Sequence, residues 1–169
     1  MAKPLPGDYP SYFSGYIQKV EQDTIPELVN TLSHPLTYFF LNLPEEKATY
    51  SYAADKWTLK DMLQHIIDTE RIMQYRLLRV ARNDKTPLPG FDENQYATSA
   101  DANKRSFVEL KEEFKSLRKS TDLLLKSLDE TQLQHIGNAS NHPVTANAIA
   151  FIIFGHLLHH KQIIEERYL

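Results

Sequence analysis

Two histidines four residues apart, His156 and His160, have the spacing in this chain that most directly suggests chemistry. At about 100° per residue they share one face of a helix, and that face also carries an apolar stripe made by Ile149, Ile152, Ile153, Leu157, Ile163 and Ile164. An imidazole buried without a partner costs about 1–3 kcal/mol, so the pair needs a shared partner. An i, i+4 pair can place two ring nitrogens about 2.0–2.1 Å from one ion. The spacing therefore favours a divalent metal.

The alternative is that water or a neighbouring carboxylate satisfies each ring, as for most single buried histidines. A third ligand would decide between the two. His159 points away from the common direction of His156 and His160 and lies at the edge of the apolar stripe. We therefore expect it to contact the ligand histidines without binding the metal, or to lie at the surface. The run also lacks the glutamate of the H-E-x-x-H pattern, which disfavours a metalloprotease. Because the chain has no cysteine, a metal must be held by His, Asp, Glu or water.

Four helices would position these residues. Apolar residues at helical spacing, with a Thr-x-x-acid pattern at two of the starts, predict helices from about 24 to 43, 58 to 82, 99 to 128 and 144 to 167. Pro35 is expected to bend or interrupt the first helix. The connections 83–99 and 129–143 are expected to be loops, and no segment has a clear strand pattern. We therefore predict an all-α four-helix bundle, as one domain over 1–169 with an N-terminal arm over about 1–23.

His65 is the third ligand that such a bundle would supply. It follows the predicted start at Thr58 by seven residues, and His160 precedes the predicted end at Arg167 by seven. The three rings come level only if the second and fourth helices are antiparallel, which makes the second and third helices parallel. The 17 residues from 83 to 99 span up to about 56 Å when extended. That is enough for a long crossover along a helix of about 37 Å.

The same topology places further residues near the site. The later half of the crossover would end near His65, so we predict that Asp92 and Glu93 orient a ligand histidine or transfer protons as catalytic residues. The alternative is that these carboxylates cap turns or face solvent. Arg76, three turns along from His65, is expected to pair with a buried carboxylate.

Composition limits the partners. The net charge of −3 is spread over both signs, which suggests neither nucleic acid nor an acidic membrane surface. The N-terminus has no apolar segment typical of a signal peptide, and the 13-residue apolar run from Ala146 to Leu158 is shorter than the roughly 20 residues that span a bilayer. We expect a soluble cytoplasmic protein. Phe151, Phe154 and Leu158 form a second apolar patch on the far side of the last helix, and exposed patches of this kind predict a homodimer.

The chain resembles the DinB-like superfamily in three motifs taken together: Lys56-Trp57-Thr58 followed by His65, the segment from Pro87 to Glu93, and Gly155-His156-x-x-His159-His160. The resemblance covers the whole chain and implies a four-helix bundle with metal ligands at His65, His156 and His160. It also implies zinc or nickel and frequent homodimers. Members similar to YfiT and the bacillithiol transferases share this bundle and three-histidine site, and for some members the resemblance implies transfer of a low-molecular-weight thiol to a small-molecule electrophile.

Two functions of different kinds are compatible with these residues. In the first, a three-histidine metal with open positions binds water or a thiol and presents it as a nucleophile, in a hydrolase or an S-transferase. In the second, the metal is structural and the protein is a non-catalytic metal-binding or stress-related interaction module. A fourth protein ligand, from His159 or a crossover carboxylate, would favour the second function.

Overall fold

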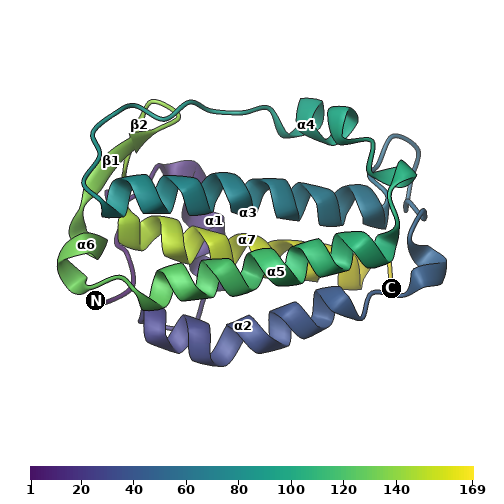
Figure 1. Cartoon of the computed structure of the whole chain (residues 1–169), viewed down its shortest axis with the longest axis horizontal. Coiled ribbons are helices and arrows are strands. Elements are labelled where there is room, and N and C mark those ends of the chain that lie inside the picture. Colours follow the sequence, from purple (N-terminus) through teal and green to yellow (C-terminus); the bar gives the residue numbers. More distant parts are fainter.

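Four long helices lie side by side in the computed structural model, which describes residues 1–169 (Figure 1). They are α2 (Ile25–Leu41), α3 (Leu59–Ala81), α5 (Phe107–Lys126) and α7 (Ala146–Arg167). Around the bundle, α3 contacts α5, α5 contacts α2, α2 contacts α7, and α7 contacts α3. The predicted all-α four-helix bundle is therefore confirmed.

The direction of the helices decides which side chains meet. α3 and α5 run one way along the bundle, while α2 and α7 run the other way (Figure 1). α3 and α7 are thus antiparallel, as the three histidines require, and the parallel pair α3 and α5 is joined by a crossover. That crossover is not a plain loop, because it contains α4 (Glu93–Ala100) and the 3-10 turn η3 (Ala102–Lys104). The predicted start of the third helix near residue 99 was wrong for the same reason.

The starts of the long helices follow local sequence. At α3, the Thr58 hydroxyl accepts a hydrogen bond from the Asp61 backbone N–H at 3.1 Å, and the Asp61 carboxylate accepts one from the Thr58 N–H at 3.0 Å. This reciprocal capping satisfies two N–H groups that a helix end otherwise leaves unpaired. α2 continues through Pro35, so the prediction of an interruption there was wrong. Packing of the flanking Ser33 and Leu36, both buried, holds the helix together across the missing hydrogen bond.

The connection before α7 also contains regular structure that the sequence did not reveal. The helix α6 (Glu130–Gln134) is followed by two antiparallel strands, β1 (Ile136–Ala139) and β2 (His142–Thr145). Ser140 and Asn141 form the turn with φ of 54° and 65°, the backbone geometry that favours two-residue hairpins. The crossover is attached to this hairpin, because the Leu88 N–H donates to the Asn138 carbonyl at 2.9 Å and the Leu88 carbonyl accepts from the Ser140 N–H at 2.9 Å.

The first half of the last helix, from Ala146 to Leu157, is buried on all sides. It packs against α2 and α3 and also against α1 (Ser14–Lys19), a short helix of the N-terminal segment that follows the turn η1 (Ser11–Phe13). Phe151 and Phe154 are 0% exposed and Leu158 is half-buried, so the apolar patch expected on the surface lies inside the single chain. The homodimer stays a prediction but loses this argument.

None of the helices, α7 included, has the length and apolar character needed to cross a membrane.

Gly155 allows α1 to lie directly on α7. A Cβ atom at this position would be 2.3 Å from the Tyr16 carbonyl oxygen and 2.6 Å from its carbonyl carbon. Both are backbone atoms, so α1 would have to move. We expect Gly155→Ala to lower the free energy of unfolding by about 1–3 kcal/mol, measured by urea denaturation. The matched control is Gly15→Ala, where a Cβ meets nothing within 4 Å and better helix propensity should leave stability unchanged or raise it. Equal stability of the two variants would contradict the close-packing argument.

Candidate metal centre

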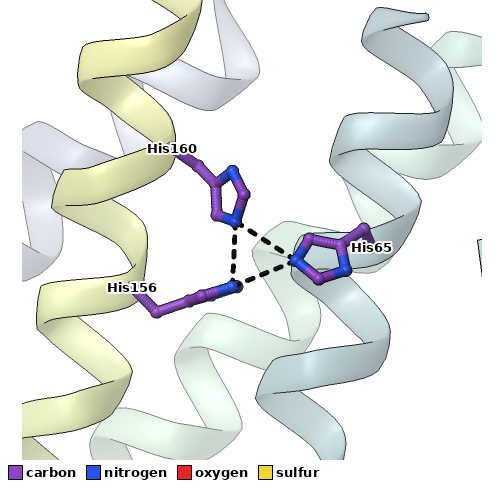
Figure 2. A group of neighbouring side chains, drawn as sticks. All are labelled: His65, His156 and His160. Carbon is purple, nitrogen blue, oxygen red and sulfur yellow. Dashed lines mark hydrogen bonds between the residues drawn. The ribbon is translucent and has the colours of Figure 1, made fainter. Parts of the chain in front are cut away.

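Three histidine rings converge between α3 and α7. The Nε2 atom of His65 lies 3.1 Å from the Nε2 atoms of both His156 and His160, and those two atoms are 2.9 Å apart. Figure 2 shows the three nitrogens turned toward one point, with His65 facing the pair across the gap between the helices. His156 and His160 are each 6% exposed, and His65 is half-buried. The structure thus brings together the three residues singled out from their spacing.

Hydrogen bonding alone does not explain this triangle. A neutral imidazole carries its proton on one ring nitrogen only, so three Nε2 atoms in mutual contact cannot each both donate and accept. A tetrahedral metal with bonds of about 2.0–2.1 Å holds its ligand nitrogens roughly 3.3 Å apart, close to the observed separations. No other His, Cys, Asp or Glu donor atom joins the group. The three side chains therefore fit one divalent ion, with no fourth ligand from a His, Cys, Asp or Glu side chain.

The surroundings keep the three rings neutral. Burial lowers the pKa of His65 to about 4, with a smaller effect from His159 in the same direction. Burial also lowers the pKa of His156 and of His160 well below 6.5, and the neighbouring histidines add to the effect. Neutral imidazole is the form that binds a metal. At neutral pH all three lone pairs are therefore available without the loss of a proton.

Aromatic rings surround the cluster and fix the histidine orientations. Trp57, just before α3, lies against His65 with ring centroids 4.7 Å apart. Tyr16 of α1 meets His156 edge-on at 5.6 Å and His159 at 5.3 Å. His159 itself stays outside the cluster and half-buried. Tyr16 was not predicted as a site residue, because it lies in the segment expected to form an N-terminal arm. Gly155, a lone glycine next to His156 in an apolar helix, was the signal that another segment approaches there.

The cluster forms part of the wall of a cavity of about 460 Å³, which we call the histidine cavity. Its walls come from the N-terminal segment, α3, the crossover, the hairpin turn and α7, and its lining residues are Tyr12, Phe13, Tyr16, Trp57, His65, Thr69, Met73, Arg76, Phe91, Glu93, Ser140, Ile152, His156 and His160. A cavity of this size is typical of small-molecule sites.

The two predicted carboxylates are separated by the structure. Glu93 lines the histidine cavity, and its charge adds to the effect of burial in raising the pKa of Tyr16. Asp92 instead caps α4, because its Oδ1 accepts from the backbone N–H groups of Asn94 at 2.9 Å and Gln95 at 3.0 Å. Asp92 does not line the histidine cavity.

Arg76 does not have the carboxylate partner that was expected. Its Nη2 donates to the Pro89 carbonyl at 2.6 Å and to the Ser140 hydroxyl at 3.1 Å. No ion pair of the chain includes it. The prediction was wrong because Glu70, the buried acid of the same helix, lies six residues earlier on another side of α3 and pairs with Arg118 of α5 at 2.7 Å.

The fold and the cluster together define a class: helical-bundle proteins with parallel second and third long helices and three histidines at a cavity. The model of the DinB superfamily matches residues 31–164. The chain belongs to this superfamily, as its motifs indicated.

Individual relatives agree with this assignment. A candidate metal-dependent hydrolase of Oceanobacillus iheyensis is 27% identical over 96 residues, which are 53% of this chain and 55% of that protein. The chain thus spans about half the length of this curated relative.

Two solved structures share the fold. YfiT from Bacillus subtilis, described as a candidate metal-dependent hydrolase with an unusual four-helix bundle topology, has a TM-score of 0.66 at 17% identity and covers 98% of this chain and 93% of its own. A mycothiol-dependent maleylpyruvate isomerase has a TM-score of 0.66 at 13% identity, over 82% of this chain and 60% of its own. At these identities the likeness shows the fold.

Proposed function

We propose that this protein is a metal-dependent enzyme in which His65, His156 and His160 bind one divalent ion, zinc or nickel. The histidine cavity then holds a small-molecule electrophile. The observation that carries the proposal is three neutral histidines sharing one wall of a cavity of about 460 Å³, with no fourth His, Cys, Asp or Glu donor beside them. Structural zinc usually has four protein ligands, whereas catalytic zinc has three and an open position.

When bound, such an ion would lower the pKa of a water molecule or a thiol and so supply a nucleophile at neutral pH. The chain's own residues have the other tasks. Trp57 and Tyr16, packed on His65 and His156, fix the ligand rings and exclude water from one side of the site. Of the two predicted carboxylates, we propose Glu93 for proton transfer, because it lines the cavity while Asp92 is engaged at the start of α4.

Hydrolysis is the first version of this chemistry. It is supported by two relatives described as candidate metal-dependent hydrolases. Thiol transfer is the second version, supported by the bundle that this chain shares with a mycothiol-dependent enzyme. In the transfer, the thiol sulfur bonds to the electrophilic carbon, the leaving group departs with its electron pair, and the thiol proton passes to a base such as Glu93.

One pair of assays tests the proposal and separates its two versions. Zinc- or nickel-loaded protein is incubated with a nitrophenyl ester alone, and separately with 1-chloro-2,4-dinitrobenzene and a low-molecular-weight thiol. We expect one of the two substrates to react at least about 100-fold faster with the wild-type protein than with His65→Ala, because that variant loses a metal ligand. A transferase consumes thiol in step with chloride release, and a hydrolase needs no thiol. Rates equal to those of His65→Ala in both assays would contradict the proposal and favour a non-catalytic metal-binding module.

Glu93 can be tested in whichever assay succeeds. Loss of a positioned proton acceptor typically costs about 10²-fold or more in rate, so Glu93→Gln should fall by that factor while keeping its metal. Asp92→Asn keeps a side-chain oxygen for the helix cap and should retain most of the activity. The opposite result, with Asp92→Asn inactive and Glu93→Gln active, would assign the proton transfer to Asp92.

A further inference from the structure

Arg76 is a buried charge that the fold leaves without a counter-charge. Only 4% of the residue is exposed, and it lines the histidine cavity. Its contacts are all neutral: the Pro89 carbonyl at 2.6 Å, the Ser140 hydroxyl at 3.1 Å, the Met73 sulfur at 3.9 Å, and the Phe91 ring with its centroid 5.9 Å from Cζ. An arginine keeps its proton at every ordinary pH. The charge is therefore available to an anion that enters the cavity.

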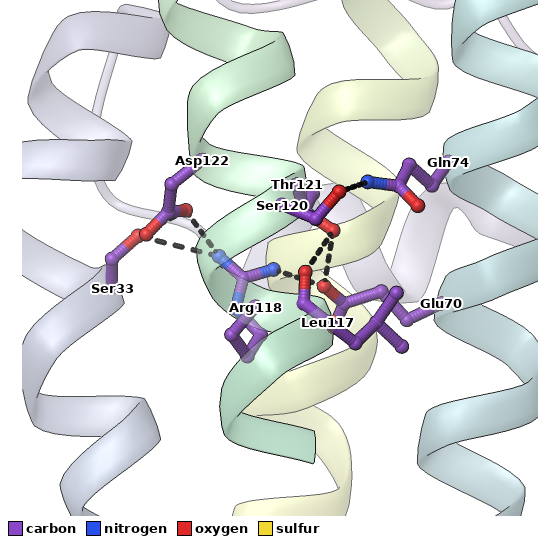
Figure 3. Close-up of polar contacts among 8 residues, drawn as sticks. All are labelled: Ser33, Glu70, Gln74, Leu117, Arg118, Ser120, Thr121 and Asp122. Carbon is purple, nitrogen blue, oxygen red and sulfur yellow. Dashed lines mark hydrogen bonds and ion pairs between the residues drawn. The ribbon is translucent and has the colours of Figure 1, made fainter. Parts of the chain in front are cut away.

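The other fully buried arginine of this bundle is treated differently. Arg118 is 1% exposed and pairs with Glu70 at 2.7 Å and Asp122 at 2.6 Å (Figure 3). Buried charges in proteins are normally paired in this way, because an isolated one is costly to desolvate. The same fold thus neutralises the arginine inside its core and leaves unpaired the arginine that borders a cavity.

The Arg76 guanidinium is also held in place before any ligand arrives. Pro89 belongs to the crossover and Ser140 to the hairpin turn, and these two segments are joined by the backbone hydrogen bonds of Leu88. Two neutral acceptors from two segments fix the planar fork, so its free donors need little reordering on binding. A planar fork matches the two oxygens of a carboxylate.

The other charged group of the histidine cavity does not serve as the partner. Glu93 lines the same cavity, but it lies outside ion-pair distance of Arg76. Its charge instead helps to raise the pKa of Tyr16 of α1. Tyr12, which also lines the cavity, is neutral at ordinary pH. The anion that Arg76 can bind must therefore come from a ligand.

We propose that Arg76 binds the carboxylate of a small organic acid whose reactive end lies at the three histidines. Arg76 follows His65 by eleven residues on α3, roughly 16 Å along the axis, and leans back toward it because helical side chains tilt toward the N-terminus. The wall between them is largely apolar, with Met73, Phe91 and Ile152 among its residues. The substrate class is thus an elongated acid with an apolar or aromatic body. This inference rests on the proposed function only in taking the histidine cavity as the substrate site.

A pair of probes that differ only in charge tests the inference. Full-length zinc-loaded protein is titrated calorimetrically with 4-phenylbutanoate and with its neutral analogue 4-phenylbutanamide. We expect the acid to bind at least about tenfold more tightly, the low end for hydrogen bonds to a charged group. Arg76→Met should reduce the acid to the affinity of the amide. Arg82→Met is the control: it removes the same charge at an exposed position just after α3 and should keep the preference.

Further arms keep the test decisive. Equal affinities for acid and amide in the wild type would overturn the proposal without any variant. If Arg76→Met does not fold by circular dichroism, Arg76→Lys replaces it; this variant keeps the charge but loses the fork, and an undiminished preference for the acid would again overturn the proposal. Should Glu93→Gln create a preference that the wild type lacks, Glu93 would be the internal partner of Arg76, which also overturns it.

The variant His65→Ala distinguishes binding of the probe carboxylate to Arg76 from its binding to the metal. The preference for the acid should persist in this variant, because Arg76 is unchanged, and its loss would mean that the carboxylate binds the metal instead. Failure of the ester and thiol assays, with the preference intact, would count against the proposed function and leave the anion site standing.

Discussion

Replacing His65 with alanine is expected to weaken zinc or nickel binding by at least about 100-fold. Residues that only support metal ligands typically cost 10–100-fold when removed, and a ligand from a set of three has no substitute in this cluster. His156→Ala and His160→Ala should behave alike, because the three Nε2 atoms are almost equidistant. Calorimetric titration of the chelator-treated protein with zinc measures the change.

Thermal unfolding provides a second measurement of the same prediction. A ligand at 100 times its Kd stabilises the folded state by about 2.7 kcal/mol, so added zinc should raise the Tm of wild-type protein. The three variants should show little or no rise. His159→Ala is the matched control, because His159 neighbours His160 on α7 but stays outside the cluster. If His159→Ala lost the zinc response while His156→Ala kept it, the ligand set would be wrong.

The cluster could be predicted because each of its determinants is local. The spacing of His156 and His160 fixes their common face by helix periodicity alone. Thr58 marks the start of α3 through its capping box with Asp61, which places His65 two turns into its helix. The antiparallel arrangement of α3 and α7 then brings His65 level with His156 and His160. No contact between distant side chains had to be known.

The remainder of the histidine cavity depends on contacts that sequence patterns do not record. Arg76 meets Ser140, 64 residues further on, through a hairpin whose strands have four residues each, too short for a clear alternation. The far side of α7 likewise depends on contacts with distant segments. Phe151 and Phe154 form a second apolar face, and only the packing of α1 and α2 on that helix distinguishes a buried face from an interface. Interior packing around a central helix therefore removed the argument for a dimer.

The Arg118 cluster is expected to carry the largest effect on stability. Its Nη1 donates to Glu70 at 2.7 Å and its Nη2 to Asp122 at 2.6 Å and Ser33 at 3.3 Å, and the guanidinium lies 5.0 Å above the Phe154 ring. The cluster thus joins α2, α3, α5 and α7, as Figure 3 shows for its polar part. Arg118→Met would leave the Glu70 carboxylate, 2% exposed, without its cation. Breaking a buried pair in this way typically costs about 3–5 kcal/mol.

The stability that Arg118→Met loses should increase as the pH rises. Burial already raises the pKa of Glu70, and Arg118 is the strongest influence that lowers it. In Arg118→Met that influence is gone, so the folded-state pKa rises further above the unfolded value of about 4.3. The folded variant then binds more protons than the unfolded chain, and its stability falls as pH rises from about 4.3 toward the folded-state pKa. Urea denaturation should therefore show a larger deficit at pH 8 than at pH 5.

Two further variants separate the charge effect from packing. Lys115→Met removes an exposed cation one turn earlier on α5, paired with Glu112 at 3.6 Å, and should cost no more than about 1 kcal/mol. Adding Glu70→Leu to Arg118→Met removes the stranded Glu70 carboxylate, so the double variant should be more stable than Arg118→Met alone and should lose the pH dependence that Glu70 causes. If Arg118→Met instead cost no more than Lys115→Met at both pH values, the cluster would not hold the four helices together, and apolar packing around Phe154 would have to account for the stability of this part of the bundle.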